Sequence, residues 1–264
     1  MNDLTGEPRR NGAPAVTRAL RVLELLADAG GSLKLTEVAE RLELPKSTAH
    51  HVLAALIDFG WVERDPHTLE VTLGLRAWEV GQAYQRAQSM SQRARPFMDA
   101  VRDQLGETIR LGIRSGRDNV CIAKSEGGKH LVFDQRVGAR LPAHATGLGK
   151  ALLSGLDDRQ LAELYAGFEF EPFTENTITS LADLQAESVA IRERGWAQDN
   201  GEYILGIRCV AVPILSRSGQ VVAAMSVSGS AGRLDDARCD KALHALHEAA
   251  GLLSERLGDD TDRT

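Results

Sequence analysis

The stretch LELPKSTAHHVLAALIDFGWVER, residues 42–64, decides how the N-terminal part of the chain folds. Apolar side chains fall at the spacing of one helical face, at Ala49, Val52, Leu53, Leu56 and Phe59. The first turn of the same helix carries hydrogen-bonding side chains instead, namely Lys46, Ser47, Thr48, His50 and His51. A helix that only buried one face would not need this polar turn. We therefore expect a helix that packs on one side and offers its first turn to a partner.

The neighbouring segments complete a small domain around this helix. Upstream, a first helix stops at Gly30 and Gly31, and its apolar face carries Val16, Leu20, Leu23 and Leu26. A second, short helix follows, with Thr36 as its N-cap. Downstream, WVERDPHTLEVTL (61–73) alternates apolar and polar residues around the turn DPHT, which predicts a β-hairpin. Three helices and a hairpin in this order predict a winged helix-turn-helix.

The polar turn suits the major groove of DNA. Lys46 and His51 can reach phosphates or guanine acceptors, and Ser47 and Thr48 can contact phosphates or base edges. Weaker candidates are His67 in the hairpin and Arg9, Arg10 and Arg21 near the N-terminus. The predicted DNA-binding set is Lys46, Ser47, Thr48, His50, His51, Arg64 and Arg18. For His50, an ordinary surface position without a DNA contact is the more typical interpretation. A capped, solvated helix end and a protein-binding winged helix remain as alternatives.

Composition limits the partners and the compartment. The chain of 264 residues is long enough for two domains, and its net charge of −6 gives no general attraction to nucleic acid or anionic membranes, so any DNA contacts must be local. No stretch approaches the length of an apolar membrane span, and the N-terminus lacks the apolar core of a signal peptide. Cys121, Cys209 and Cys239 stand far apart, which disfavours disulfides and a zinc site. We expect a cytoplasmic protein without a metal, a cofactor or a membrane partner.

Beyond residue 106 the hydrophobic period changes to two. Residues 108–114 and 119–126 alternate as neighbouring strands, and residues 207–215 and 220–230 form a later strand pair. Helical patterns lie at residues 146–153, 158–165, 182–194 and 235–257. This order predicts an α+β domain with an antiparallel sheet.

The later strand pair predicts which side chains share a face. Taking SRSG (216–219) as a four-residue hairpin loop pairs the residues on either side of it. This register sets Cys209 opposite Ser226 and Ile207 opposite Ser228, so a thiol, two hydroxyls and an aliphatic side chain lie on one face. Small polar groups there either satisfy neighbouring backbone or line a cavity for a small polar molecule, and both interpretations remain open.

A second wall for such a cavity lies at ATGLGKALL (145–153). Thr146 can cap this helix and leave the backbone N–H groups of Gly147 and Leu148 exposed at its start. A helix end of this kind can bind a carboxylate. Together with the polar strand face, it suggests a small organic acid as the ligand.

Three separate stretches resemble one protein family. Residues 16–64, LPAHATGLGKALL (141–153) and GIRCVAVPILSRSGQVVAAMSVSG (206–229) are similar to the IclR family of bacterial transcriptional regulators, and the resemblance extends over about residues 16–257. It implies a GAF-like effector-binding domain after the winged helix. It maps ligand contacts onto Leu141, Gly147, Leu148, Asp199, Ile207, Cys209, Ser226 and Ser228. The chain departs from its relatives at His51, where arginine is common, and at Asn200 and Gly201, where acidic residues are common.

The resemblance also implies an order of domains. We expect a disordered arm (1–14), the winged helix-turn-helix (15–74), a linker helix (75–92), the effector-binding domain (93–258) and a disordered tail (259–264). A new helix should start at Pro96. Two packed helices of one domain are the alternative for the segment around the linker. Dimer contacts are implied for the N-terminal region, in a homodimer or a dimer of dimers.

These features predict a DNA-binding transcriptional regulator, more often a repressor in this family, whose operator binding is modulated by a small organic acid. The alternative is a GAF-like redox or hydrolytic enzyme that uses Cys209. Within RCVAVPI (208–214), however, this cysteine has neither a helix N-terminus nor a local base to activate it, so we expect no enzyme. The predicted partners are double-stranded operator DNA, the organic-acid effector and a second copy of the chain.

Overall fold

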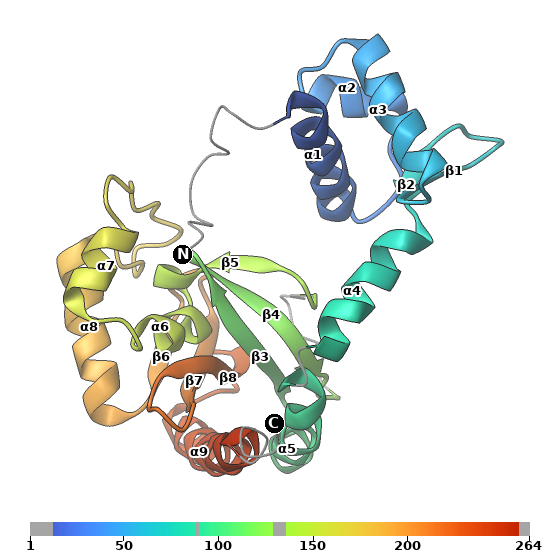
Figure 1. The fold of residues 1–264 in the computed structure, drawn as a ribbon. Coiled ribbons are helices and arrows are strands. Elements are labelled where there is room, and N and C mark those ends of the chain that lie inside the picture. The colour runs from blue at the N-terminus through green and yellow to red at the C-terminus, as the bar shows by residue number, and fades with distance from the viewer. Residues whose placement is uncertain (1–12, 88–89, 129–135, 259–264) are drawn as a thin grey trace. The chain divides into compact units, whose positions relative to one another are not determined.

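The computed structural model describes residues 13–87, 90–128 and 136–258 (Figure 1). Their contacts divide into an N-terminal unit that ends at residue 87 and a C-terminal unit that starts at Met90. Among the described residues no helix is long and apolar enough to cross a membrane. The predicted arm, up to residue 12, and the predicted tail at 259–264 lie outside the described residues.

The N-terminal unit is the predicted winged helix-turn-helix. The helices α1 (Pro14–Ala29), α2 (Leu35–Arg41) and α3 (Lys46–Asp58) precede a hairpin of β1 (Val62–Arg64) and β2 (Val71–Leu73). Gly30 ends α1 by adopting a left-handed backbone with φ of 61°, which a residue without Cβ does at no steric cost. The core is formed by Val22, Leu26, Leu33, Val38, Leu42, Leu53, Leu56, Val62 and Val71. The unit therefore buries a core of its own.

The start of α2 differs from the prediction. Lys34 is the N-cap and Thr36 lies inside the first turn. The Glu37 side chain accepts from the Lys34 backbone N–H at 2.7 Å. This contact satisfies an N–H that would otherwise lack a helical partner, and it sets the helix start ahead of the threonine.

The buried face of α1 also differs from the prediction. Val16 and Leu20 are 58% and 55% exposed, and the side chains that enter the core are Val22 and Leu26. α1 begins at Pro14, a residue assigned to the arm, because proline is favoured in the first turn of a helix. Its first two turns therefore keep apolar side chains outside the core of this unit.

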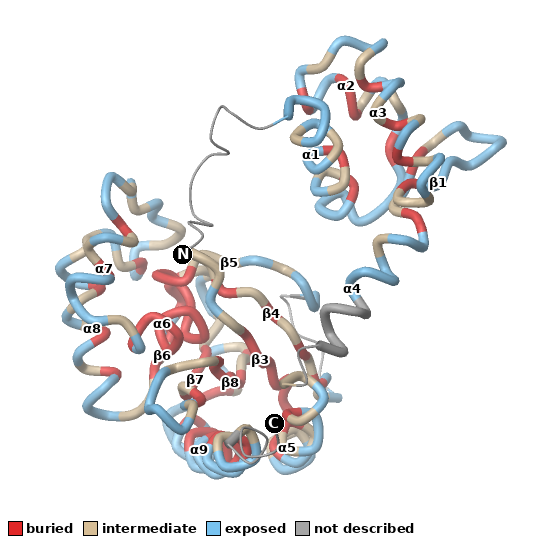
Figure 2. Tube along the Cα trace, viewed as in Figure 1, coloured by how far each residue is buried: buried red, intermediate tan, exposed pale blue. Residues whose placement is uncertain are grey.

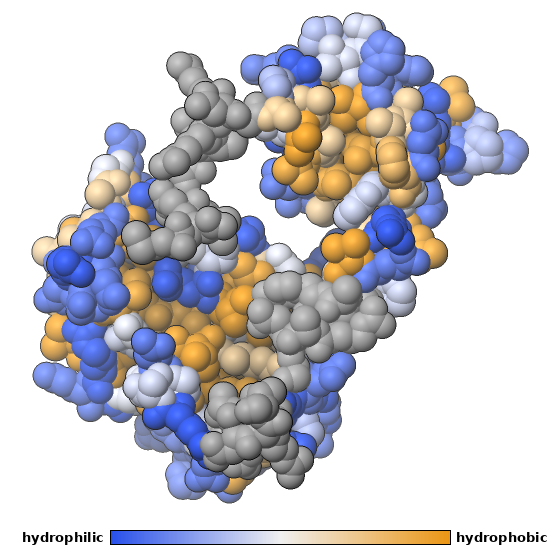
Figure 3. All heavy atoms as spheres, viewed as in Figure 1, coloured by the Kyte–Doolittle hydropathy of each residue, from blue (hydrophilic) through white to orange (hydrophobic). Residues whose placement is uncertain are grey.

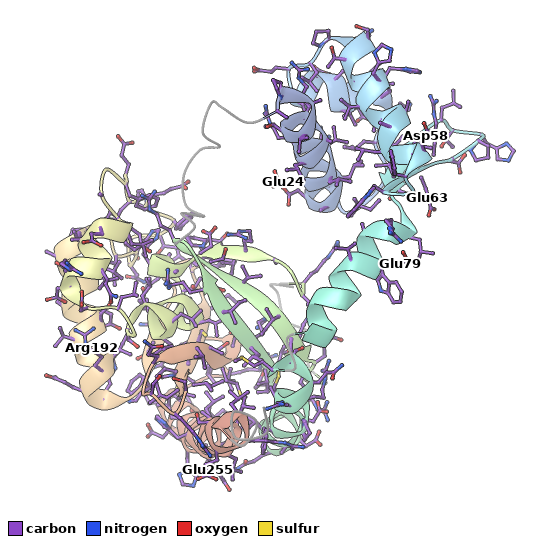
Figure 4. All side chains as sticks on the ribbon, viewed as in Figure 1. Glu24, Asp58, Glu63, Glu79, Arg192 and Glu255 are labelled. Carbon is purple, nitrogen blue, oxygen red and sulfur yellow. The ribbon has the colours of Figure 1, made fainter. Side chains whose placement is uncertain are left out.

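Two helices follow the hairpin. α4 (Leu75–Ala87) starts beside Glu63, whose Oε1 accepts from the Leu75 N–H at 3.1 Å; Figure 4 labels this glutamate at the base of the hairpin. The predicted helix start at Pro96 is wrong, because α5 (Met90–Leu105) begins earlier and contains this proline. Proline weakens a helix by removing one N–H donor. Burial of Ala94 and Met98 against the sheet stabilises α5 across that position.

The C-terminal unit is built on a six-stranded antiparallel sheet in the order β5-β4-β3-β8-β7-β6. Its strands are β3 (Thr108–Ser115), β4 (Asp118–Ser125), β5 (Arg140–Pro142), β6 (Ala197–Asn200), β7 (Ile207–Leu215) and β8 (Val221–Ser230). The edge strands β5 and β6 carry little sequence signal, because such short segments show almost no periodicity. The sheet and its helices confirm the predicted α+β class.

Helices cover both faces of this sheet. One face packs against α5 and α9 (Asp236–Gly258), with fully buried Ile109, Leu111, Val212 and Met225 from the strands. The other face packs against α6 (Gly147–Leu153), and α6 in turn contacts α8 (Leu181–Arg194), which packs on α7 (Asp158–Leu164). Every residue of α6 is buried, as its red tube in Figure 2 shows. Arg192 of α8, labelled in Figure 4, donates to the Leu156 carbonyl at 2.9 Å and joins the segment after α6 to α8.

The register of β7 and β8 differs from the prediction by two residues. Cys209 pairs with Ser228 instead of Ser226, and Ile207 pairs with Ser230 instead of Ser228. The hairpin loop is one residue longer than predicted, and a bulge near the end of β7 shifts the pairing by one more. Because the total shift is even, Cys209, Ser226 and Ser228 still share one face.

Candidate nucleic-acid interface and effector cavity

The polar first turn of α3 faces solvent. Lys46, Ser47, His50 and His51 are exposed, and Thr48 is half-buried. No side chain caps the start of α3, and no acidic residue lies in its first turn. The first N–H groups of this helix are therefore left without side-chain partners, and such a helix end attracts phosphate.

The predicted DNA-binding residues lie on two sides of α3. Arg18, Thr48 and His51 line a groove between α1 and α3, whereas His50 and Arg64 line another groove toward the hairpin. The two histidines are adjacent, with ring centroids 6.0 Å apart, and yet they line different grooves. Arg64 is held near the hairpin because its Nε donates to a backbone carbonyl there at 3.4 Å. The winged helix thus presents hydrogen-bonding groups on both flanks of α3.

The groove between α1 and α3 is otherwise apolar. Phe59 is 77% exposed at one end, and Val16 and Leu20 on α1 are more than half exposed. Figure 3 shows a large apolar area on this unit. Apolar patches of this kind on small domains usually mark a contact surface.

The C-terminal unit contains a cavity between α6 and the sheet. All eight predicted effector residues line it, namely Leu141, Gly147, Leu148, Asp199, Ile207, Cys209, Ser226 and Ser228. Thr146, predicted as a helix cap, lines it too, as do Arg110, Asn119, Tyr203 and Ile204. The volume of the cavity is about 40 Å³, which is room for about three water molecules. Any ligand of this cavity must be small.

Small residues bring α6 close to the sheet. A Cβ on Gly112 of β3 would lie 2.6 Å from the Leu148 side chain, and a Cβ on Gly147 would lie 3.1 Å from Cys209 Sγ. A Cβ on Gly149 would lie 2.3 Å from the Ala143 backbone. Ala197, Ala211 and Ala224 complete this small-residue floor under α6. Gly147 therefore places the start of α6 directly on the polar strand face, and Gly149 lets α6 approach the Ala143 backbone of the preceding segment.

A row of polar side chains crosses four strands, and three of its four members line the cavity. Asp199 pairs with Cys209, Cys209 with Ser228, and Ser228 with Thr108, so these four residues lie side by side on the face under α6. The next row carries Arg110 opposite Ser226. A thiol, hydroxyls, a carboxyl group and a guanidinium thus converge on one small space.

The carboxyl group of Asp199 is tied to a buried ion pair. Its Oδ1 accepts from the Glu202 N–H at 2.7 Å, and Glu202 Oε1 lies 2.5 Å from Lys150 Nζ. Lys150, on α6, is 3% exposed, and Glu187 on α8 lies 3.6 Å from its amine. Burial raises the pKa of Asp199 to about 7; the hydrogen bond from the Glu202 N–H opposes this rise, the Glu202 charge adds to it, and Lys150 opposes it. A large share of Asp199 is therefore neutral near pH 7.

Thr146 confirms its predicted role as the cap of α6. Its Oγ1 accepts from the Gly149 N–H at 3.3 Å and from Asn119 Nδ2 at 2.8 Å, and donates to the Pro142 carbonyl at 3.1 Å. A hydroxyl has one donor and two acceptor positions, so these contacts use all of them. Thr146 supports the cavity wall and has no further hydrogen-bonding capacity for a ligand.

Cys209 is unsuited to nucleophilic chemistry. Burial raises the pKa of its thiol to about 11, further raised by Asp199 and opposed by Ser228, Arg110 and Ser226. The thiol is therefore protonated at physiological pH, and the thiolate is the nucleophilic form. In the described residues no group of three histidine, cysteine or acidic side chains is arranged to hold a metal ion.

Four lining residues were not predicted from the sequence, namely Arg110, Asn119, Tyr203 and Ile204, and for the first two the reason is physical. In TIRLGIR (108–114), the apolar alternation assigns Ile109, Leu111 and Ile113 to the core and leaves Arg110 on the outer face. α6 packs over the outer face of β3 at this point, and Arg110 is only 2% exposed. Asn119 is fully buried in the same way. The sequence did contain one signal for Arg110, because a charged residue alternates there with apolar residues of the strand.

The comparisons with known proteins agree with this architecture. The IclR helix-turn-helix domain matches residues 15–66, and the bacterial transcriptional regulator IclR C-terminal domain matches residues 82–255. The chain is similar to the HTH-type transcriptional regulator XynR of Escherichia coli (strain K12), with 34% identity over 92% of this chain and 97% of that protein. It is also similar to the HTH-type transcriptional repressor AllR of the same strain, with 32% identity over 92% of that protein and 94% of this chain.

A solved structure shows the same fold with a ligand. An IclR homolog complexed with 4-hydroxybenzoate, from Microbacterium hydrocarbonoxydans, superposes with a TM-score of 0.82 at 25% identity, covering 92% of this chain and 98% of that one. The matched family and relatives are DNA-binding regulators and not enzymes, which excludes the enzyme alternative built on Cys209. The chain belongs to the IclR family of bacterial transcriptional regulators.

Proposed function

We propose that this regulator is a cytoplasmic, homodimeric repressor whose operator binding is controlled by a small organic acid held in the cavity under α6. The observation that carries this proposal is that the eight residues implied by the family resemblance line one small cavity, which Arg110 also lines. The repressor role is supported by AllR, a relative named as a repressor. The acid is supported by the structure of the relative with 4-hydroxybenzoate.

The homodimer is supported by the apolar groove of the winged helix. Val16, Leu20 and Phe59 expose apolar surface that a second copy would cover. Two winged helices in one dimer would read a roughly palindromic operator with half-sites about 10 base pairs, or a small multiple, apart. A dimer of dimers would bind two such operators.

Operator binding is tested by selecting DNA sequences with the full chain and measuring affinities by gel shift. Lys46→Ala should weaken binding to all sequences, because a lysine at this turn contacts phosphate, whereas His51→Ala should relax the preference at one base position. Lys241→Ala, on α9, is the matched control and should bind as the wild type does. Equal affinities of all four proteins across the series would contradict this assignment of α3.

Effector control is tested at Ser228. Ser228→Ala removes a cavity hydroxyl and should weaken effector binding by about 1 to 2 kcal/mol, while operator affinity without effector stays unchanged. Ser230→Ala is the control, because Ser230 lies two residues further on the same strand and does not line the cavity. A Ser228→Ala protein that melts at a lower temperature but responds normally to effector would assign the hydroxyl to local structure instead.

A further inference from the structure

Arg110 gives the cavity a permanent positive charge. Its side chain comes from β3, lines the cavity and is 2% exposed. A guanidinium stays protonated at any pH at which proteins fold, and its planar set of N–H donors matches the two oxygens of a carboxylate. A guanidinium has five N–H donors, so Arg110 can bind an anion in the cavity beside the contacts that it makes within the protein. The guanidinium therefore favours an anionic occupant of the cavity.

Asn119 adds a second requirement. Its Nδ2 donates to the Leu141 carbonyl at 3.1 Å and to Thr146 Oγ1 at 2.8 Å. Because a carbonyl can only accept, the amide orientation is set, and the oxygen must point away from Leu141. This Oδ1 is buried and accepts no hydrogen bond from any described residue. A buried acceptor without a donor costs free energy, and a ligand that brings an O–H or N–H removes this cost.

The size of the cavity limits what can satisfy both groups. Space for about three water molecules suits an acid of a few heavy atoms. A carboxylate can form an ion pair with Arg110, and a hydroxyl can donate a hydrogen bond to Asn119 Oδ1. An oxo group in place of that hydroxyl could only accept a hydrogen bond, and it would leave the Asn119 oxygen without a donor.

We propose that the effector is a short 2-hydroxy acid, whose carboxylate is bound by Arg110 and whose hydroxyl donates to Asn119 Oδ1, and that these two residues distinguish it from the corresponding 2-oxo acid. This inference rests on the proposed function, because it names the effector class of the same cavity. Arg110 and Asn119 are then the residues that determine effector specificity.

Three-carbon probes test the proposal because they differ at one group only. Isothermal titration calorimetry on the full chain compares D- and L-lactate, pyruvate, propionate and lactamide. At least one lactate enantiomer should bind about tenfold or more tightly than pyruvate and propionate, the effect of leaving one buried acceptor without a donor. Lactamide, which lacks the negative charge, should bind about a hundredfold more weakly. Pyruvate binding as tightly as lactate, or no binding of either lactate at millimolar concentration, would overturn the proposal.

Variants assign the two contacts. Arg110→Met should lose about a hundredfold in lactate affinity and Arg110→Lys less, whereas Lys124→Met, which removes a charge from the residue paired with Arg110 on β4, should change nothing. Asn119→Leu should bind lactate and pyruvate equally. Unchanged lactate affinity in Arg110→Met would overturn the carboxylate contact. If that variant does not fold, the comparison of lactate with lactamide on the wild type decides the point.

Measurements of operator binding distinguish a failure of the 2-hydroxy acid proposal from a failure of the proposed function. Gel shifts with the selected operator are run on the same protein samples, without acid and with lactate. Operator binding that no lactate alters would refute the 2-hydroxy acid and leave the DNA-binding regulator standing. Loss of all sequence-specific DNA binding in the wild type would refute the proposed function itself.

Discussion

The titration of Asp199 should make the stability of the C-terminal unit depend on pH. Asp199 is 5% exposed, and its pKa rises from 3.8 to about 7 on folding, chiefly because burial disfavours the charged form. A carboxyl group with a raised pKa binds its proton more tightly in the folded state. Its contribution to stability is therefore complete below the unfolded pKa and is lost as the pH rises through the folded pKa.

The magnitude follows from the size of the shift. At about 1.4 kcal/mol per pKa unit, the whole effect is about 4 kcal/mol, of which about 3 kcal/mol is lost between pH 5 and pH 8. Asp199→Asn removes the titration but keeps an oxygen that can accept from the Glu202 N–H. The variant should therefore lose about 3 kcal/mol less than the wild type over this pH range.

Urea unfolding at pH 5 and pH 8 measures this difference directly. Asp240→Asn, at an exposed position of α9, controls for the loss of one carboxylate and should follow the wild type. If Asp199→Asn and the wild type lose the same stability between the two pH values, the reasoning from burial is refuted. A variant that is less stable at both values by one constant amount would assign Asp199 a structural role only.

Three further perturbations test the packing and charge of the molecule. Gly149→Ala should destabilise the C-terminal unit by about 2 kcal/mol or more in thermal unfolding, because its Cβ would overlap the Ala143 backbone, whereas Gly251→Ala on α9 meets nothing within 4 Å and should be neutral or slightly stabilising. Lys150→Met should cost about 3 to 5 kcal/mol by leaving Glu202 as a buried charge, whereas Arg159→Met in an exposed pair should cost less than about 1 kcal/mol. Acidic side chains outnumber basic ones over residues 1–85, so a salt titration of operator binding should give a slope of log K no steeper than about −8 per dimer, at about 0.9 for each neutralised phosphate; a steeper slope would show that the basic contacts are more extensive.

Much of the fold follows from sequence patterns because local chemistry and tertiary packing agree. The apolar spacing around Leu53 and Leu56, the glycine after α1 and the alternation in β3 each have one structural solution. The sequence patterns give wrong predictions where tertiary packing determines the structure. α5 continues through Pro96 because the sheet holds its buried face, and the exposed Val16 depends on the angle at which α1 crosses the core.

Eight of the residues that line the cavity were predictable, but the geometry of the cavity was not. A bulge at the end of β7 leaves no mark in the sequence, so the partner of Cys209 could not be assigned, although an even shift kept its face correct. Arg110 was missed because alternation in a strand indicates two faces without showing what covers each of them. Its role needs the three-dimensional position of α6, which periodicity does not contain.

The small-residue floor under α6 has a consequence for how new specificities arise. Ala197, Ala211, Ala224 and Gly112 set the height at which α6 rests on the strands, and none of these four is among the residues that line the cavity. A larger side chain at one of them would lift the helix and enlarge the chamber while every ligand-contacting residue stayed the same. Substitutions at these four positions can therefore change which metabolite the cavity accepts, in evolution or in protein engineering. A survey restricted to the residues that line the cavity would not include them.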